Sequence, residues 1–166
     1  MRPSAEEIVR SIAATFDEYL LPEIDEPFAH SLALTVSNLL RHVALRLEQE
    51  GPMLVAEIAD LRAVLAEIQA FAGASPGCDA VLARVAPACG ARPRDGSYVG
   101  ISDLHDEATE LGWALQHAIH ALDGAAPTVA TLDGYAEVRQ SIRRHLRRSL
   151  EREGALIVPA FTGERR

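Results

Sequence analysis

The sequence predicts an all-α protein, an antiparallel bundle of about five principal helices with one short extra helix. Hydrophobic residues make up 48% of the 166 residues and aromatic residues only 5%, so the core must consist mainly of Leu, Val, Ile and Ala. Ala and Leu favour helix, whereas sheet cores use more β-branched and aromatic residues. The length fits a single domain over residues 1–166, which can bury about 70% of its unfolded surface.

The first helix is predicted from its start signal. Ser4 and Glu7 have the spacing of a capping box, in which each side chain accepts a hydrogen bond from the other residue's backbone N–H. Pro22 predicts the end of this helix. Its inner face is defined by apolar residues three or four positions apart: Ile8, Ile12, Phe16 and Tyr19.

The next two helices are predicted over residues 28–50 and 54–73, separated by Gly51-Pro52. The inner face of the first is expected to carry Phe28, Leu32, Val36, Leu39, Val43 and Leu47. The inner face of the second is expected to carry Leu54, Ile58, Leu61, Leu65 and Ile68. The short link predicts that these two helices run antiparallel.

The pattern weakens over residues 73–101, where Gly and Pro recur, so we expect an irregular insertion loop with one short helix over residues 79–86. Ser102 or Asp103 is expected to cap the next helix, which Gly124 should end. Its predicted inner residues are Leu104, Ala108, Leu111, Leu115, Ala118 and Leu122. A last helix over residues 135–152 should bury Tyr135, Val138, Ile142 and Leu146. Residues 154–166 are expected to form an extended C-terminal tail.

The charge and the start of the chain narrow the class of protein. The net charge of −8 argues against nucleic-acid binding, which needs a basic surface. All 16 basic residues are Arg, which suggests a GC-rich bacterial genome. The polar N-terminal residues lack the apolar region of a signal peptide, and no apolar run approaches the ~18 residues of a membrane span. We therefore expect a cytoplasmic protein with no membrane partner.

Cys78 and Cys89 are expected to be free thiols. They show neither CxxC spacing nor a metal-ligand spacing. If the residues between them are helical, a rise of about 1.5 Å per residue holds the sulfurs too far apart to bridge. The sequence predicts no metal site and no cofactor. His30, His42, His105 and His145 are scattered along the chain and predict no site.

The outer face of the helix that begins near residue 102 is the first candidate surface. At about 100° per residue, five polar or aromatic residues fall opposite its leucines: Asp106, Glu110, Trp113, His117 and His120. A metal would need a third ligand besides the two histidines, and the Glu-x-x-His pair of bundle metal sites is absent. Trp113 is expected to be covered by a second subunit, or by a loop or the C-terminal tail through Ile157 or Phe161. The remaining alternative is that this face is solvated.

The second candidate surface is the back of the helix over residues 28–50, where Leu34, Asn38 and Leu45 lie away from the predicted inner face. A helix that is apolar on two faces lies between layers of a domain or in an oligomer interface. Both alternatives remain open from the sequence.

The third candidate surface is the Arg-rich last helix. Residues 135–166 carry a net charge of +4 and residues 1–134 a net charge of −12. The cluster could bind a phosphate, a CoA-like ligand or an acidic partner, or its members could pair with Glu137, Glu151 and Glu153. It comprises Arg139, Arg143, Arg144, Arg147, Arg148 and Arg152.

Part of the sequence resembles a known family. The run Asn38-Leu39-Leu40, followed by Arg46, Glu48 and Gly51-Pro52, is similar to a family of short, uncharacterised bacterial helical proteins. Members are often encoded beside acyl-CoA dehydrogenases and aminoglycoside-phosphotransferase-like kinases, and the Arg-rich helix also looks similar. The resemblance extends over the helix at residues 28–50 and, more loosely, residues 111–153. It implies an accessory role near acyl-CoA metabolism. The family has no established catalytic residues, so none is carried over to this chain.

The sequence therefore favours a non-enzymatic helical protein that self-associates as a homo-oligomer and serves as an accessory or partner-binding module. The alternative is a bundle that binds a small ligand or acts as an enzyme, through the His117/His120 face or the Arg-rich helix.

Overall fold

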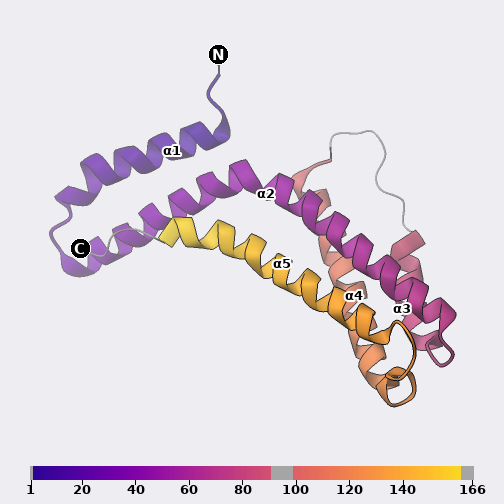
Figure 1. Cartoon of the computed structure of the whole chain (residues 1–166). Helices are drawn as coiled ribbons and strands as arrows, with labels where there is room; N and C mark the ends of the chain where they lie inside the picture. The colour runs from indigo at the N-terminus through magenta and orange to yellow at the C-terminus, as the bar shows by residue number, and fades with distance from the viewer. Residues whose placement is uncertain (1, 91–98, 162–166) are drawn as a thin grey trace. The chain divides into compact units, whose positions relative to one another are not determined.

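The computed structural model describes residues 2–90 and 99–161, with side chains up to residue 157, and this part of the chain is α-helical without any strand. The all-α prediction is confirmed. The chain divides into two compact units: unit 1 comprises Met1–Gly51 and Glu151–Arg166, and unit 2 comprises Pro52–Leu150. Figure 1 labels the five α-helices found in the described residues.

Unit 1 begins with α1 (Ala5–Thr15), which continues through a π-helical turn, η1 (Phe16–Leu20), and a 3-10 turn, η2 (Leu21–Glu23). The capping box is confirmed, since Glu7 N donates to Ser4 Oγ and Ser4 N donates to Glu7 Oε2. The first half of α2 follows. Two ion pairs join the elements in opposite chain order, Arg10 with Glu48 and Asp17 with Arg41, so α1 runs back along α2.

Helix α2 (Pro27–Ala74) is one helix of 48 residues, so the predicted break at Gly51-Pro52 is wrong. An interior proline lacks the N–H for one helical hydrogen bond and usually kinks or breaks a helix. Here the helix continues past Pro52, and the dipeptide instead coincides with the boundary between the two units. Gly51-Pro52 therefore marks the boundary between two packing units and not the end of a helix.

Unit 2 combines the second half of α2 with α3 (Asp79–Gly90), α4 (Ile101–Val129) and the first part of α5 (Tyr135–Phe161). Its core is made of large apolar side chains from all four helices. Fully buried members include Leu65, Ile68, Val81, Val85, Leu122 and Val129. The predicted inner residues of this unit are largely confirmed, although Leu146 is about half exposed.

Three boundaries in the second half of the chain differ from prediction. Helix α4 begins at Ile101 with Gly100 as its N-cap, so the expected cap at Ser102 or Asp103 is wrong. The expected loop over residues 73–101 contains α3, four residues longer than the predicted short helix, while residues 91–98 lie outside the described part. Helix α4 passes through Gly124 and ends at Val129. A helical glycine costs about 1 kcal/mol, which burial of Leu122 and Val129 on either side offsets.

The expected extended tail is wrong over residues 154–161, because α5 remains helical to Phe161, and residues 162–166 lie outside the described part of the chain. The turn before α5 depends on Gly134, whose φ of +89° favours glycine. A Cβ there would lie 3.4 Å from the Phe71 ring, which packs beside Tyr135 with ring centroids 6.1 Å apart. This turn brings α5 against α2 within unit 2.

Candidate functional site

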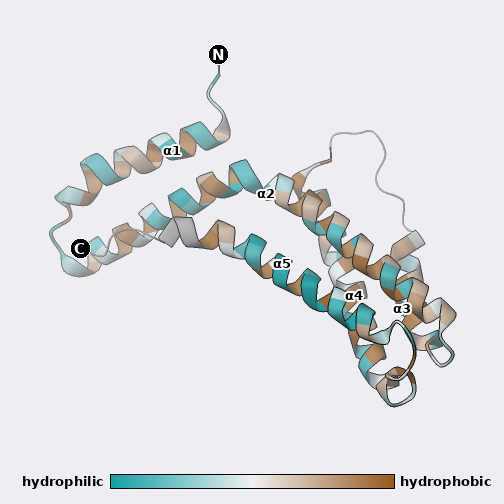
Figure 2. Cartoon of the chain, viewed as in Figure 1, coloured by the Kyte–Doolittle hydropathy of each residue, from teal (hydrophilic) through white to brown (hydrophobic). Residues whose placement is uncertain are grey.

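The first half of α2 carries a row of large apolar side chains that is exposed to solvent. Figure 2 shows hydrophobic residues recurring along this part of the helix. The sequence pattern predicts these residues in the protein interior, and that prediction is wrong. Each is between 43% and 71% exposed, and together we call them the apolar stripe: Phe28, Leu32, Val36, Leu39, Val43 and Leu47.

Unit 1 buries small side chains instead. The buried residues are Ala13 on α1 and Ala33, Ser37 and Ala44 on α2, with Leu156 the one large apolar side chain buried among the described residues of this unit. At about 100° per residue, the three α2 residues lie together on a face next to the apolar stripe. The distance between packed helices depends on the side chains at the contact. The contact with α1 therefore uses the small-residue face of α2 and leaves the apolar stripe uncovered.

Helix α1 has the same property. Ile8, Ile12, Tyr19 and Leu20 are about half exposed or more, although the first three were predicted to face inward. Phe16 is half-buried. The exposed apolar surface of unit 1 thus extends beyond α2.

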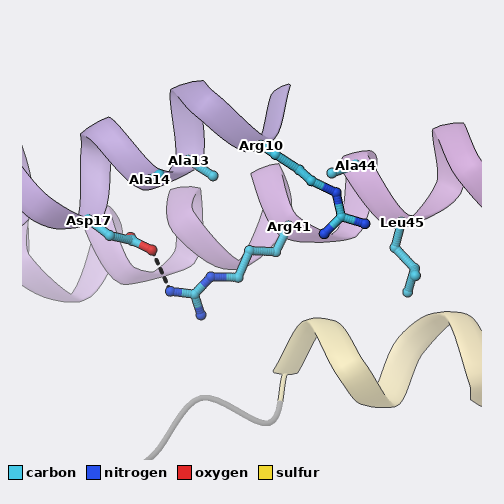
Figure 3. Close-up of a pocket in the computed structure, with 7 residues that line it drawn as sticks. All are labelled: Arg10, Ala13, Ala14, Asp17, Arg41, Ala44 and Leu45. Carbon is cyan, nitrogen blue, oxygen red and sulfur yellow. Dashed lines mark hydrogen bonds and ion pairs between the residues drawn. The ribbon is translucent and has the colours of Figure 1, made fainter. Parts of the chain in front are cut away.

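Ion pairs line the contact between α1 and α2. Arg10 pairs with Glu6 and, at 3.0 Å, with Glu48, while Arg41 reaches Asp17 across the contact (Figure 3). A cavity of about 410 Å³ lies beside Arg10, Asp17 and Arg41, and its apolar wall includes Ala13, Ala14, Ala44 and Leu45. The Arg10–Glu48 and Asp17–Arg41 pairs fix the register in which α1 lies on α2.

The Asp17 carboxyl reports the electrostatics of this contact. Burial alone would raise its pKa, because it disfavours the charged form. The Ser37 hydroxyl and the Arg41 guanidinium favour the carboxylate and outweigh burial, so the pKa of Asp17 lies below its ordinary value. The charged form of Asp17 therefore stabilises the contact.

The residues of the predicted second surface, on the back of α2, differ in how much of them is buried. Leu34 is exposed and Asn38 is half-buried. Leu45 is half-buried and lines the cavity beside Arg10. On the same side, His42 Nδ1 lies 3.2 Å from the carbonyl oxygen of Leu156, so the end of α5 packs near this face. The back of α2 is therefore partly used within unit 1.

In unit 2, Trp113 lies on the outer face of α4, as predicted, and is 56% exposed. It borders a cavity of about 420 Å³ between α3 and α4, together with Glu110, His117 and Arg84. The Trp113 and His117 rings are 6.1 Å apart at an interplanar angle of 33°. Asp106 is exposed and does not line this cavity. No described residue buries Trp113, and the Phe161 side chain lies outside the described part of the chain.

His117 and His120 serve different surfaces. His120 borders another cavity of about 340 Å³, with Gln116, Leu61 and His145. Within the described residues, no group of three or more His, Cys, Asp or Glu side chains could hold a metal ion. The structure therefore does not bring the two predicted histidines together with a third ligand.

His145 is the site residue that sequence reasoning missed. It is only 2% exposed, its Nδ1 lies 3.1 Å from Asp60 Oδ2, and its Nε2 lies 3.6 Å from Glu57 Oε1. Asp60 also accepts hydrogen bonds from Arg148, and Ser149 Oγ donates to Glu57 Oε1. This polar cluster joins α2 to α5 within unit 2. Its contacts between the two helices join residues 85 or more positions apart in sequence, and no local motif signals them.

The Arg-rich helix is only partly neutralised. Arg139 pairs with Asp123 of α4, and Arg148 pairs with Asp60 of α2. Arg143, Arg144 and Arg147 are exposed, and no ion pair involves them in the described ranges. The predicted pairing with Glu137, Glu151 and Glu153 is therefore not found for these three residues. They form a patch of like charge on α5.

Comparisons with known proteins give no assignment: no family model, no curated protein and no solved structure matches this chain. None of the helices in residues 2–90 and 99–161 has a segment both long enough and apolar enough to cross a bilayer.

Proposed function

We propose that this protein is a self-associating helical protein that acts as an accessory or partner-binding module. The observation that carries the proposal is the apolar stripe, a row of large side chains exposed on a unit whose buried residues are mostly Ala and Ser. Single exposed apolar residues are ordinary on a protein surface, whereas a contiguous patch marks an interaction site.

The size of the stripe supports a stable interface. An aromatic side chain presents about 150–250 Å² and the smaller Leu and Val side chains less, so the observed exposures leave roughly 500 Å² over the six residues. That is in the upper half of the ~300–600 Å² range of patches found on monomers. It also supplies most of the ~800 Å² that each partner buries in a standard interface. Exposed residues of α1, such as Ile8 and Ile12, could contribute the remainder.

The free energy expected from burying the apolar stripe also supports self-association. Burying the exposed half of such a side chain contributes about 1 kcal/mol, so two stripes together contribute about 12 kcal/mol. Association costs about 4–15 kcal/mol in lost translational and rotational freedom. Self-association through this surface is thus favourable at ordinary protein concentrations when flanking contacts add to the stripe.

A matched pair of neighbouring substitutions tests the proposal. Leu32→Glu places a charge on the stripe, and Ser31→Glu places the same charge on the next residue, which is exposed but off the stripe. Sedimentation velocity over a concentration series should show wild type and Ser31→Glu as oligomers and Leu32→Glu shifted toward monomer. Circular dichroism should show that all three keep their helix content. A wild-type protein that stays monomeric at high concentration would refute self-association.

A second candidate function is binding of an anionic ligand or acidic partner on α5, favoured by the unpaired Arg143, Arg144 and Arg147. Exposed guanidinium groups bind phosphate and carboxylate through bidentate hydrogen bonds. The accessory role near acyl-CoA metabolism, implied by the family resemblance, would make CoA the natural probe. CoA should then raise the melting temperature in a salt-sensitive way, and Arg143→Ala/Arg147→Ala should abolish the shift. A salt-insensitive shift, or none, would count against this candidate.

A further inference from the structure

The spacing of the apolar stripe has a symmetry that bears on its partner. Its six residues are separated by four, four, three, four and four positions. The pattern reads the same in both directions about a point between Ser37 and Asn38. It is also an 11-residue repeat, with Phe28, Leu32 and Val36 followed by Leu39, Val43 and Leu47. An 11-residue repeat gives about 3.67 residues per turn, close to the 3.6 of a straight helix.

We propose that the partner is a second copy of this chain, whose α2 packs antiparallel on the apolar stripe across a two-fold axis between Ser37 and Asn38. This inference rests on the proposed self-association and specifies its geometry. A two-fold interface uses the same patch on both copies, so the patch must be self-complementary. The symmetric spacing meets this requirement, because each stripe residue lies level with another: Phe28 with Leu47, Leu32 with Val43, and Val36 with Leu39.

Side-chain size favours the antiparallel direction over the parallel one. In the antiparallel arrangement each valine lies level with a leucine. The Leu32–Val43 and Val36–Leu39 layers on either side of the axis therefore have the same composition and similar width. In a parallel arrangement each residue would meet its own copy, and narrow Val36–Val36 layers would alternate with wide Leu39–Leu39 layers. Helices pack best when side chains fill the space between them without voids.

Charge favours the same direction. Arg46 lies at the edge of the stripe near one end, with its side chain about half exposed and 3.0 Å from Glu50. In the antiparallel arrangement it lies level with Ala29 of the second copy, within about one turn of that copy's Asp25 and Glu26. In a parallel arrangement it would face a second Arg46, and like charges at close range disfavour association. Each end of the antiparallel interface would thus bring Arg46, with its partner Glu50, beside Asp25 and Glu26 of the second copy.

Disulfide trapping distinguishes the two directions. Leu32→Cys and Val43→Cys are prepared separately in the full-length chain, with the native Cys78 and Cys89 retained. In the antiparallel arrangement position 32 lies level with position 43, whereas two copies of position 32 lie about 16 Å apart along the helix axis. A disulfide requires Cα atoms within about 7 Å. We expect mild oxidation to trap dimers when the variants are mixed, and little dimer from either variant alone or from wild type.

Peptide mapping by mass spectrometry should identify the 32–43 linkage. Efficient trapping of each variant alone would overturn the antiparallel inference while leaving self-association in place. The mixture failing to cross-link, although both reduced variants sediment as dimers, would move the interface to another surface and also overturn the inference. If wild type sediments as a monomer, the proposed function itself fails.

Should either cysteine variant lose its dimer, Arg46→Glu combined with Asp25→Arg provides the second test. Association weakened by the single change and restored by the double change supports the arrangement, and no restoration contradicts it.

Discussion

Unit 2 and the first half of α2 in unit 1 have the same kind of sequence pattern but opposite burial. In unit 2, Leu61, Leu65 and Ile68 recur at helical spacing and are buried by α3, α4 and α5. In unit 1, Leu32, Leu39 and Val43 recur at the same kind of spacing and remain about half exposed. Periodicity therefore reports that a helix has an apolar face, and a separate observation is needed to show which chain covers that face.

The largest expected difference between the units concerns truncation of a leucine. Leu65→Ala removes a fully buried side chain and should lower the free energy of unfolding by about 2–5 kcal/mol. Urea denaturation should show this loss equally at low and high protein concentration. In the proposed dimer a second copy covers the exposed half of Leu39, so Leu39→Ala should cost less at low concentration and more at high concentration. Equal, concentration-independent losses would remove the distinction between the units.

The polar cluster of unit 2 should have the next largest effect. Asp60→Asn removes the charge that accepts hydrogen bonds from His145 and Arg148. We expect a loss of about 1.5–3 kcal/mol in the free energy of unfolding, as for hydrogen bonds to charged groups. Glu67→Gln, at an exposed position on the same helix, should change it by less than about 0.5 kcal/mol. Similar values for both variants in chemical denaturation would mean that the cluster does not hold α2 to α5.

The Asp17–Arg41 ion pair of unit 1 should contribute less to the free energy of unfolding, and its contribution should depend on pH. The folded pKa of Asp17 is below its unfolded value, so its contribution is present above the unfolded pKa and is lost as pH falls through the folded pKa. Asp17→Asn should therefore lower the melting temperature near pH 7, by the equivalent of about 1 kcal/mol or less. The difference from wild type should shrink toward pH 3. Exposed Glu18 provides the control through Glu18→Gln. A difference that stays constant with pH would contradict this role for Asp17.

The smallest expected effect is on the rate at which a thiol reagent modifies the cysteines. Burial raises the pKa of both Cys78 and Cys89, and Arg62 offsets this only in part at Cys89. A thiol reagent should thus react slowly with native protein and count two thiols after unfolding without reductant. An added Leu39→Cys thiol in unit 1 should react quickly in dilute solution and more slowly as concentration rises. A count of zero after unfolding would contradict the free thiols found in the structure.

The sequence predicts most of unit 2 because its residues are covered by neighbours in the same chain. Leu111, Leu115 and Leu122 were assigned to the core of α4, and Trp113 to the outside, and the structure agrees. Unit 1 was predicted with its faces exchanged. Leucines outweigh alanines in any apolar pattern, whereas the contact between α1 and α2 buries Ala33, Ser37 and Ala44.

Two other features could not be read from local sequence. The pairing of His145 with Asp60 joins residues 85 positions apart, and its geometry exists only after α5 packs on α2. Gly51-Pro52 has the form of a helix end, yet α2 passes through it. Local propensity is a weak prior there, because packing on both sides can hold a helix together across an unfavourable residue.

Hydrogen–deuterium exchange at two protein concentrations tests the central claim most directly. Peptides from residues 58–72 of unit 2 should be protected to the same degree at both concentrations, because their own chain buries them. Peptides from residues 27–51 should gain protection as concentration rises and lose it in the Leu32→Glu variant, while Ser31→Glu should behave as wild type. Protection of residues 27–51 that is the same at both concentrations and in both variants would contradict the account, since the apolar stripe would then need no second copy.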